Sequence, residues 1–302
     1  MLSWTMGSEV FTVNAELTAG WNVTWNPCAL GSQPARGKLV SVAPHIKAIA
    51  TNLSAPCTWS CVRGRPYCVD AADARVSPAT QMALKGEWYE ANCKTLLYRK
   101  SKSHTSSLAG SLVATGGLYF GDYLPLLASL AGEEGVVHGF EPNPGSFRLA
   151  KATAQANRLA RVRLYPNCLS ADAEASLKLC VRSTGGSPLG GLSTGFGKKR
   201  EDHQCGQFAE ASCVSFDATL PWQHRRVGLL LLDLQGAEQE ALQGARRLIT
   251  RWRPLIAIEQ PAETLPRAWP WLSALGYNRT APDCSSKSSR YGYVGLMFYA
   301  AE

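Results

Sequence analysis

The chain has 302 residues, of which 45% are hydrophobic and 18% charged, and its formal net charge is +8. This length and balance fit one large domain, or one domain plus an appendage, and exclude a chain dominated by disorder. The basic excess favours acidic partners in general. The sequence shows no motif of interleaved aromatic and basic residues, which disfavours a nucleic-acid-binding protein.

No run of about 18 apolar residues occurs, so no membrane span is predicted. The first residues, MLSWTMGSEV, lack a basic segment followed by an apolar core, so no secretory signal is predicted either. We therefore expect a cytoplasmic protein whose ten cysteines are reduced and mostly buried thiols. In such a protein the N-x-[ST] patterns at Asn22, Asn52 and Asn278 would carry little meaning.

Residues 1–78 are expected to form an irregular N-terminal appendage. They contain four tryptophans and many Ser, Thr and Pro residues, without a sustained helical or strand period. The spacing Cys57-x3-Cys61-x6-Cys68, with Cys28 upstream, leaves a metal site open as an alternative. No metal is predicted, because the paired C-x2-C spacing of a zinc knuckle and a nearby His at ligand spacing are both missing.

Residues 79–302 are expected to form the main domain. Helical turns are expected within 79–99, and from residue 111 apolar runs alternate with amphipathic segments. Strands are expected at 111–116, 136–142, 162–169, 177–181, 212–216, 227–234, 254–260 and 292–300, and helices at about 121–131, 144–158, 237–250 and 264–275. This alternation predicts an α/β fold with a mostly parallel sheet and helices on both faces. The unbroken GLLLLDL at 228–234 suits a central strand buried on both sides.

The turn after the first of these strands, in VATGGLYFGDYLPLLA at 113–128, resembles a nucleotide-binding turn. A dinucleotide loop needs G-x-G-x-x-G, because the pyrophosphate must approach bare backbone. Here Gly117 and Gly121 are separated by three larger residues, and the middle glycine is missing. The turn therefore suits a nucleoside ligand without a pyrophosphate, such as S-adenosylmethionine. A nicotinamide-dependent oxidoreductase is a disfavoured alternative on the same fold.

Three strands of the predicted sheet end in an acid: Glu141, Asp233 and Glu259. Ligands of such sheets bind beyond the carboxyl ends of the strands. A carboxylate at Glu141 can accept both hydroxyls of a ribose. Asp233 follows a very apolar strand, so its charge must face a cleft or a partner. The three acids predict a polar rim that forms a ligand site.

Residues 79–302 resemble the FkbM family of S-adenosylmethionine-dependent methyltransferases. The resemblance rests on GEWYEAN (86–92), on the turn at 113–128, and most specifically on FEPNP (140–144) and DLQGAE (233–238). It implies a Rossmann-like class I methyltransferase fold with seven strands, the last antiparallel. It also implies O-methylation of a hydroxyl on a small molecule or glycan, such as a sugar or natural product.

The resemblance assigns roles to individual residues. Gly117, Tyr119, Gly121 and Asp122 would line the methionine end of the cofactor, Glu141 would hold its ribose, and Cys168 and Leu169 would flank its adenine. Asp233 would face donor and acceptor, and it is the predicted catalytic residue, because a carboxylate near the methyl group can accept the hydroxyl proton. His203 and His224 are alternative bases on a variable stretch.

Some positions depart from the family pattern. Thr115 stands where methyltransferases often have an acid, Leu231 replaces a common lysine, and Gln235 replaces the acid two residues after Asp233. These departures keep a second hypothesis open, in which the chain is a non-catalytic scaffold that retained the fold and binds a partner.

Overall fold

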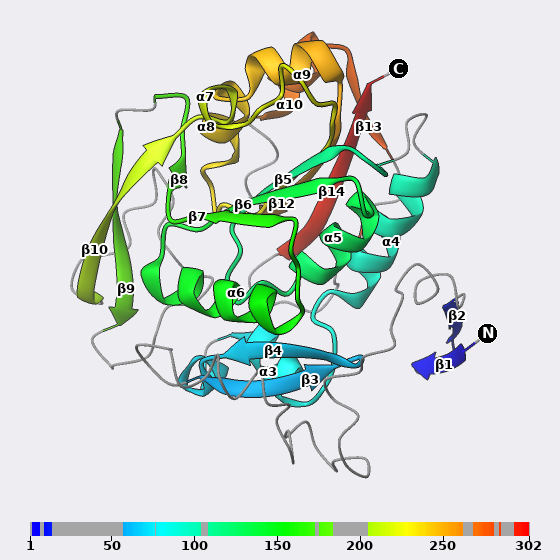
Figure 1. Ribbon diagram of the computed structural model, residues 1–302, viewed down its shortest axis with the longest axis vertical. Coiled ribbons are helices and arrows are strands. Elements are labelled where there is room, and N and C mark those ends of the chain that lie inside the picture. Colours follow the sequence, from blue (N-terminus) through cyan, green and yellow to red (C-terminus); the bar gives the residue numbers. More distant parts are fainter. Residues whose placement is uncertain are drawn as a thin grey trace.

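The computed structural model describes residues 2–6, 9–13, 57–75, 77–103, 108–172, 175–183, 205–261, 268–280, 284 and 293–301. A seven-stranded sheet in the order β13-β14-β12-β11-β5-β6-β7 forms its centre (Figure 1). The parallel strands are β5 (Leu112–Gly116), β6 (Val136–Phe140), β7 (Val162–Tyr165), β11 (Val227–Leu232) and β12 (Leu255–Pro261), and the antiparallel ones are β13 (Tyr277–Thr280) and β14 (Tyr293–Ala301). This arrangement confirms the predicted Rossmann-like α/β fold with an antiparallel last strand.

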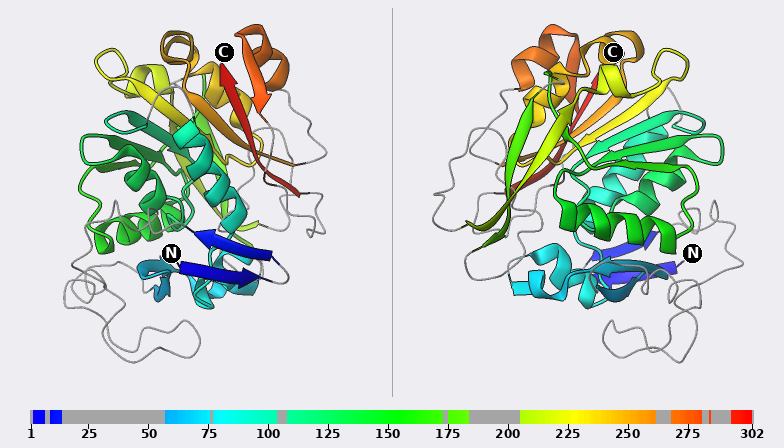
Figure 2. Two further views of the ribbon diagram at one scale, coloured as in Figure 1. Left: turned by 90° about the vertical axis from the view of Figure 1, so that its right-hand side faces the viewer. Right: turned by 60° about the vertical axis from the view of Figure 1, so that its left-hand side comes forward.

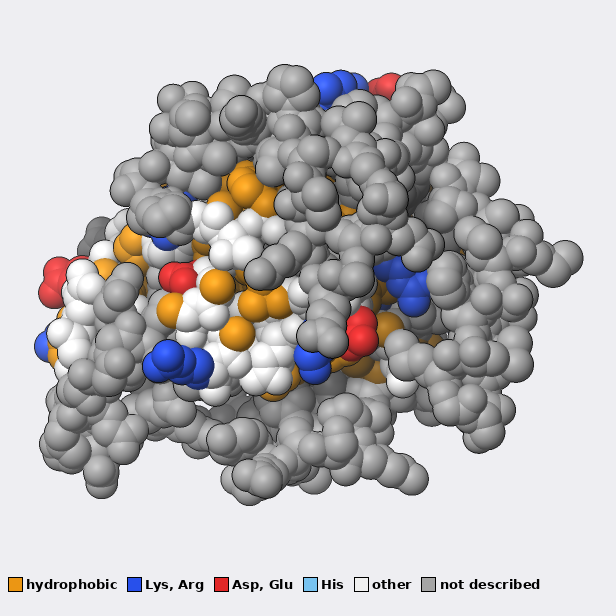
Figure 3. Space-filling model, turned by 90° about the horizontal axis from the view of Figure 1, so that it is seen from below, with side chains coloured by type: hydrophobic (Ala, Val, Ile, Leu, Met, Phe, Trp, Pro, Cys, Tyr) orange, Lys and Arg blue, Asp and Glu red, His pale blue; other side chains and the backbone are white. Residues whose placement is uncertain are grey.

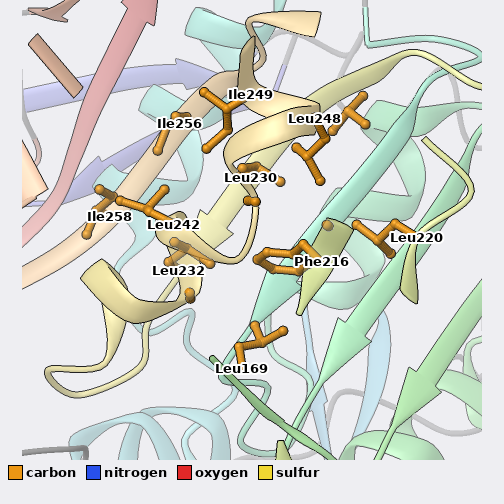
Figure 4. Close-up of a cluster of buried hydrophobic side chains, with 14 of the residues drawn as sticks. Leu169, Phe216, Leu220, Leu230, Leu232, Leu242, Leu248, Ile249, Ile256 and Ile258 are labelled. Carbon is orange, nitrogen blue, oxygen red and sulfur yellow. The ribbon is translucent and has the colours of Figure 1, made fainter. Parts of the chain in front are cut away.

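Helices cover both faces of the sheet (Figures 1 and 2). On one face lie α4 (Ala91–Ser103), α5 (Leu124–Ala131) and α6 (Pro144–Ala156), and on the other α7 (Phe216–Thr219), α8 (Glu238–Gln243), α9 (Arg246–Trp252) and α10 (Ala268–Ala274). Strand β11 packs against both sets, because successive side chains of a strand point to opposite faces. Leu229 and Leu231 join the α4–α6 core, whereas Leu230 and Leu232 join the α7–α9 core (Figure 4). The expected doubly buried central strand is therefore confirmed.

Two expected elements are divided in the structure. The helix expected at 237–250 separates into α8 and α9 at Gly244, where a Cβ would lie 2.3 Å from the carbonyl oxygen of Ser170. The strand expected at 162–169 separates into β7 and β8 (Cys168–Leu169). Strand β8 belongs to a second sheet of order β8-β10-β9, with β9 at Ser176–Ser183 and β10 at Cys205–Val214.

Part of the expected N-terminal appendage packs directly on the main domain. The described elements of the appendage as a whole are the hairpin β1 (Leu2–Met6) and β2 (Glu9–Val13), the hairpin β3 (Thr58–Val62) and β4 (Arg65–Val69), the 3-10 helix η1 (Ala71–Arg75), and α3 (Pro78–Leu84), which crosses the expected boundary. We call residues 57–84 the hairpin layer. It covers α6 through a shared apolar cluster and through the Asn157 side-chain amide, which donates to the carbonyl of Pro66 at 2.7 Å. The division into 1–78 and 79–302 stays a prediction.

The face of the molecule at the hairpin-layer end shows hydrophobic side chains with Lys, Arg, Asp and Glu side chains at separate positions among them (Figure 3). Among the described helices, none is long and apolar enough to cross a bilayer.

The described cysteines are paired, contrary to the expectation of reduced thiols. Disulfides join Cys57 to Cys68, Cys93 to Cys284, Cys168 to Cys213, and Cys180 to Cys205. Cys61 is also disulfide-bonded, so no described cysteine is free. The alternative of a metal site at Cys57, Cys61 and Cys68 is therefore wrong as well. Sequence reasoning could not find these pairs, because pairing depends on which cysteines the fold brings together.

Candidate functional site

The turn after β5 lies against the end of β11. Gly117 has φ 79°, and a Cβ at this position would lie 1.8 Å from the carbonyl oxygen of Asp233. The amide of Asp233 donates to the carbonyl of Gly116 at 3.0 Å, and the amide of Gly117 donates to that of Phe140 at 3.0 Å. Only glycine fits position 117. The backbone there is left-handed, and a Cβ would collide with the carbonyl oxygen of Asp233. The turn thus places three strand ends together at the carboxyl edge of the sheet.

Glu141 holds this turn in place. One of its carboxylate oxygens accepts hydrogen bonds from the amides of Leu118 and Tyr119 at 2.9 and 3.0 Å, and the other accepts from the amide of Asn143 at 2.8 Å. Burial raises the pKa of Glu141 to about 7, whereas the three amide bonds act in the opposite direction. The carboxylate therefore lies beside the turn, as its predicted role requires. The contact with a ribose stays a prediction.

Gln235 joins two of the predicted acids. Its side-chain nitrogen donates to Asp233 Oδ1 at 2.8 Å and to Glu259 Oε2 at 2.7 Å. Glu259 is only 5% exposed, and its pKa lies well above the ordinary value because of burial and the nearby charge of Asp233. A neutral amide with two N–H groups can hold two carboxylates that would otherwise repel each other. The departure at Gln235 from the family pattern thus has a defined structural role.

The chain turns sharply after β11. Gln235 and Gly236 have φ 54° and 110°. The buried side chain of Glu238 accepts hydrogen bonds from the amides of Leu234 at 2.9 Å and Gly236 at 3.1 Å. Burial raises the pKa of Glu238 to about 7, against the effect of these amides. Glu238 therefore holds the turn that carries Gln235, much as Glu141 holds the turn after β5.

Lys94 of α4 positions Asp122. Its ammonium group donates to Asp122 Oδ2 and to the carbonyl of Tyr89, both at 2.7 Å, and lies 3.9 Å from the centre of the Tyr123 ring. The side chain of Lys94 is 1% exposed and that of Asp122 is 18% exposed. A buried ammonium with these partners fixes the orientation of the carboxylate. Asp122 is therefore held in place at the turn, and its role at the methionine end stays a prediction.

Glu90 is a further acid of the site. The Tyr123 hydroxyl donates to Glu90 Oε2 at 2.8 Å. Burial raises the pKa of Glu90 to about 7, Lys94 opposes the rise, and Asp233 adds to it. This mutual influence places Glu90 near Asp233. Sequence reasoning missed both Glu90 and Lys94, although GEWYEAN, which contains Glu90, was part of the family resemblance.

Three other residues predicted to line the cofactor make contacts within the protein instead. They are Tyr119, Cys168 and Leu169. The Tyr119 hydroxyl reaches the hairpin layer, where it donates to Asp73 Oδ2 at 2.9 Å and lies 2.5 Å from Thr80 Oγ1. Cys168 is buried in its disulfide. Leu169 lies in the core with Phe216 and next to the turn, since a Cβ at residue 116 would be 2.6 Å from its Cδ1 (Figure 4). Their roles toward methionine and adenine stay predictions.

Of the two histidine candidates, His224 lies within the described residues and does not join the site. His203 lies outside the described residues. His224 is exposed and precedes β11, so it lies at the edge of the sheet opposite Asp233. Within the described ranges, no group of three or more His, Cys, Asp or Glu residues could hold a metal ion.

Carboxylates therefore gather around a glycine turn at the carboxyl edge of the sheet, with a lysine bound to one of them. They are Glu90, Asp122, Glu141, Asp233 and Glu259. Such a rim suits a cationic ligand, and its carboxylates can also accept a proton from a bound hydroxyl.

The family model of the methyltransferase FkbM domain matches residues 116–279. A search of curated proteins found no match. Among solved structures, the methyltransferase FkbM from Methylobacillus flagellatus KT is similar at 14% identity and a TM-score of 0.45, over 85% of this chain and 58% of that one. The O-methyltransferase from Bacillus cereus in complex with SAH is similar at 11% identity and a TM-score of 0.45, over 87% of this chain and 93% of that one.

Proposed function

Because the chain belongs to the FkbM methyltransferase family, as expected from the sequence, we propose that it transfers the methyl group of S-adenosylmethionine to the oxygen of a hydroxyl-bearing small molecule or glycan. The observation that carries the proposal is the set of buried carboxylates around the Gly117 turn. S-adenosylmethionine carries a sulfonium and an ammonium group, so an anionic rim attracts it. The turn lacks the middle glycine that lets the pyrophosphate of a dinucleotide approach the backbone.

In this proposal the cofactor lies across the turn. Glu141 accepts its ribose hydroxyls while its amide contacts keep the turn in shape. Asp122, oriented by Lys94, binds the ammonium group at the methionine end. The paired acids and Gln235 then lie toward the methyl group and the acceptor.

Methyl transfer is an in-line displacement. The acceptor oxygen bonds to the methyl carbon, the carbon–sulfur bond breaks, and its electron pair stays on sulfur, which becomes a neutral thioether. The hydroxyl proton passes to Asp233, the proposed general base. Gln235 fixes the Asp233 carboxylate and holds Glu259 beside it. Orientation and exclusion of water supply the rest of the rate.

The scaffold hypothesis rests on the departures at Leu231 and Gln235. Leu231 is buried in the core, and Gln235 bridges two acids. An organised acid pair of this kind favours catalysis over a retained but unused fold.

The disulfides also indicate the cellular compartment in which the protein acts. A reducing cytoplasm keeps thiols unpaired, whereas stable disulfides form in secretory and extracellular compartments. We therefore propose an oxidising compartment for this enzyme in place of the expected cytoplasm.

The test uses the full, oxidised chain. Calorimetry with S-adenosylmethionine and with S-adenosylhomocysteine measures cofactor binding. Labelled cofactor, incubated with a library of hydroxyl compounds, then measures transfer. We expect saturable binding and label in at least one hydroxyl compound. Binding without transfer to any acceptor would favour the scaffold hypothesis, and the absence of binding at millimolar cofactor would refute the proposal.

A further inference from the structure

We propose that Asn278 carries an N-linked glycan. Asn278 begins the triplet Asn278-Arg279-Thr280, which is the acceptor pattern for this modification. The triplet forms the end of β13, the outer strand of the sheet beyond β14. Tyr277 points into the core, but Asn278 and Arg279 are both exposed. The acceptor side chain therefore stands at the surface of the folded protein.

The disulfides supply the second, independent condition. The pattern matters only in a chain that enters a secretory compartment, and the same compartment forms disulfides. Four described pairs, one of them linking residues 191 positions apart, indicate that the chain folds there. The proposal thus rests on the cysteines and the acceptor pattern, and it is independent of methyl transfer.

The strand register places the glycan away from the candidate site. Asn278 pairs with Ala300 of β14, whereas Glu259, at the site, pairs with Leu296 of the same strand. Four residues of strand correspond to about 13 Å. Because β14 runs antiparallel to β12, Asn278 lies toward the amino ends of the parallel strands. A large sugar at this position would leave the carboxyl edge open.

The fold also indicates when the modification occurs. The Thr280 hydroxyl, which the acceptor pattern requires, donates to the carbonyl of Phe298 at 3.3 Å and accepts from the ammonium group of Lys100 at 3.0 Å. Both contacts form only after β13 has paired. The transfer therefore precedes folding of this strand, while the hydroxyl is accessible.

The chemistry needs one co-reactant, an oligosaccharide linked to a lipid through pyrophosphate. The Asn278 amide nitrogen bonds to the anomeric carbon of the first sugar and loses a proton. The bond from that carbon to the pyrophosphate oxygen breaks, and the lipid pyrophosphate leaves with the electron pair.

The experiment expresses the full chain in cultured animal cells behind a cleavable secretion leader. Enzymatic removal of N-glycans in ¹⁸O-labelled water converts a glycosylated Asn278 into an isotope-labelled aspartate, which mass spectrometry of the tryptic peptide detects. We expect this label in the unsubstituted chain and in T280S, which keeps the acceptor pattern. We expect a faster-migrating band for N278Q in a background with N22Q and N52Q, and no such shift for the matched variant R279K.

An unlabelled Asn278 peptide, in either secreted or retained protein, would overturn the proposal. Because the readout is on the unsubstituted chain, it does not depend on the folding of any variant. A negative result would leave the methyltransferase proposal unaffected, since no activity is measured.

Discussion

The carboxyl edge of the seven-stranded sheet and the segments that flank the sheet are held together by different means. At the edge, buried acids bind backbone amides and one another, through Glu141, Glu238 and the Asp233–Gln235–Glu259 bridge. In the flanks, disulfides close the β3–β4 hairpin and join β10 to β8 and to β9. The edge therefore responds to protons, and the flanks respond to reductants. The proposed chemistry takes place in the region that can titrate.

The disulfide between Cys93 and Cys284 connects the two regions covalently. Cys93 precedes Lys94 in α4, and Cys284 lies before β14. This bond thus ties the helix that positions Asp122 to the antiparallel side of the sheet. The predictions below separate acid effects at the edge from covalent effects at the flanks.

The largest effect is expected for D233N. The amide keeps the shape of the side chain but cannot accept the hydroxyl proton, so turnover should fall on the order of 10²–10⁴-fold. Cofactor affinity, measured by calorimetry, and the melting temperature should change little. Unchanged turnover would remove Asp233 from the mechanism and shift attention to Glu90, its acidic neighbour.

A large loss of stability is expected for C93S/C284S. A cross-link restricts the unfolded chain, and it does so more when it closes a longer loop. Removing this one, which spans 191 residues, should lower the free energy of unfolding by about 5 kcal/mol. The corresponding loss for C57S/C68S, where the pair is 11 residues apart, should be about 3 kcal/mol. Urea unfolding of both variants measures this. Equal losses would indicate that native contacts, rather than the length of the closed loop, determine the effect.

The edge could be predicted from sequence because its signals are local. The unbroken apolar run ending in Asp233, the spaced glycines and the acid after β6 all lie within single elements. The disulfides and the contacts of Tyr119 could not be predicted, because they join residues that only the finished fold brings together. The role of Lys94 could not be predicted for the same reason, since its partner Asp122 lies 28 residues away in the sequence.

E238Q should alter the pH dependence of stability. The pKa of Glu238 is raised to about 7 in the folded state, so the proton is bound more tightly there than in the unfolded chain. The resulting stabilisation is complete below the unfolded pKa, near 4.5, and is lost as the pH rises through about 7. Wild-type unfolding free energy should fall over this range by up to about 3 kcal/mol more than that of E238Q.

The control for this measurement is E133Q, which changes an exposed acid outside the site. Its pH profile of stability, from urea unfolding, should follow the wild type. A profile of E238Q that also follows the wild type would mean that Glu238 does not titrate on folding.

E141A should weaken cofactor binding more than E259A does. The alanine loses the proposed ribose contact and leaves three amides of the turn without their acceptor, at a cost of about 1.5–3 kcal/mol. Calorimetry with S-adenosylhomocysteine measures both variants. Equal affinities would show that the ribose is held elsewhere.

The smallest effect is expected for Y119F, and it tests whether the hairpin layer is part of the working site. The lost hydroxyl forms hydrogen bonds with Asp73 and Thr80, both in the hairpin layer. The free energy of unfolding should therefore fall by about 0.5–1.5 kcal/mol. Turnover and cofactor affinity should not change, because the backbone amide that Tyr119 offers to Glu141 remains. The matched variant Y123F removes a hydroxyl that serves Glu90 instead, and it should lower turnover. If Y119F lowered turnover as much as Y123F, the hairpin layer would have to be counted as a wall of the site, and the contrast between an acidic edge and an inert flank would fail at this residue.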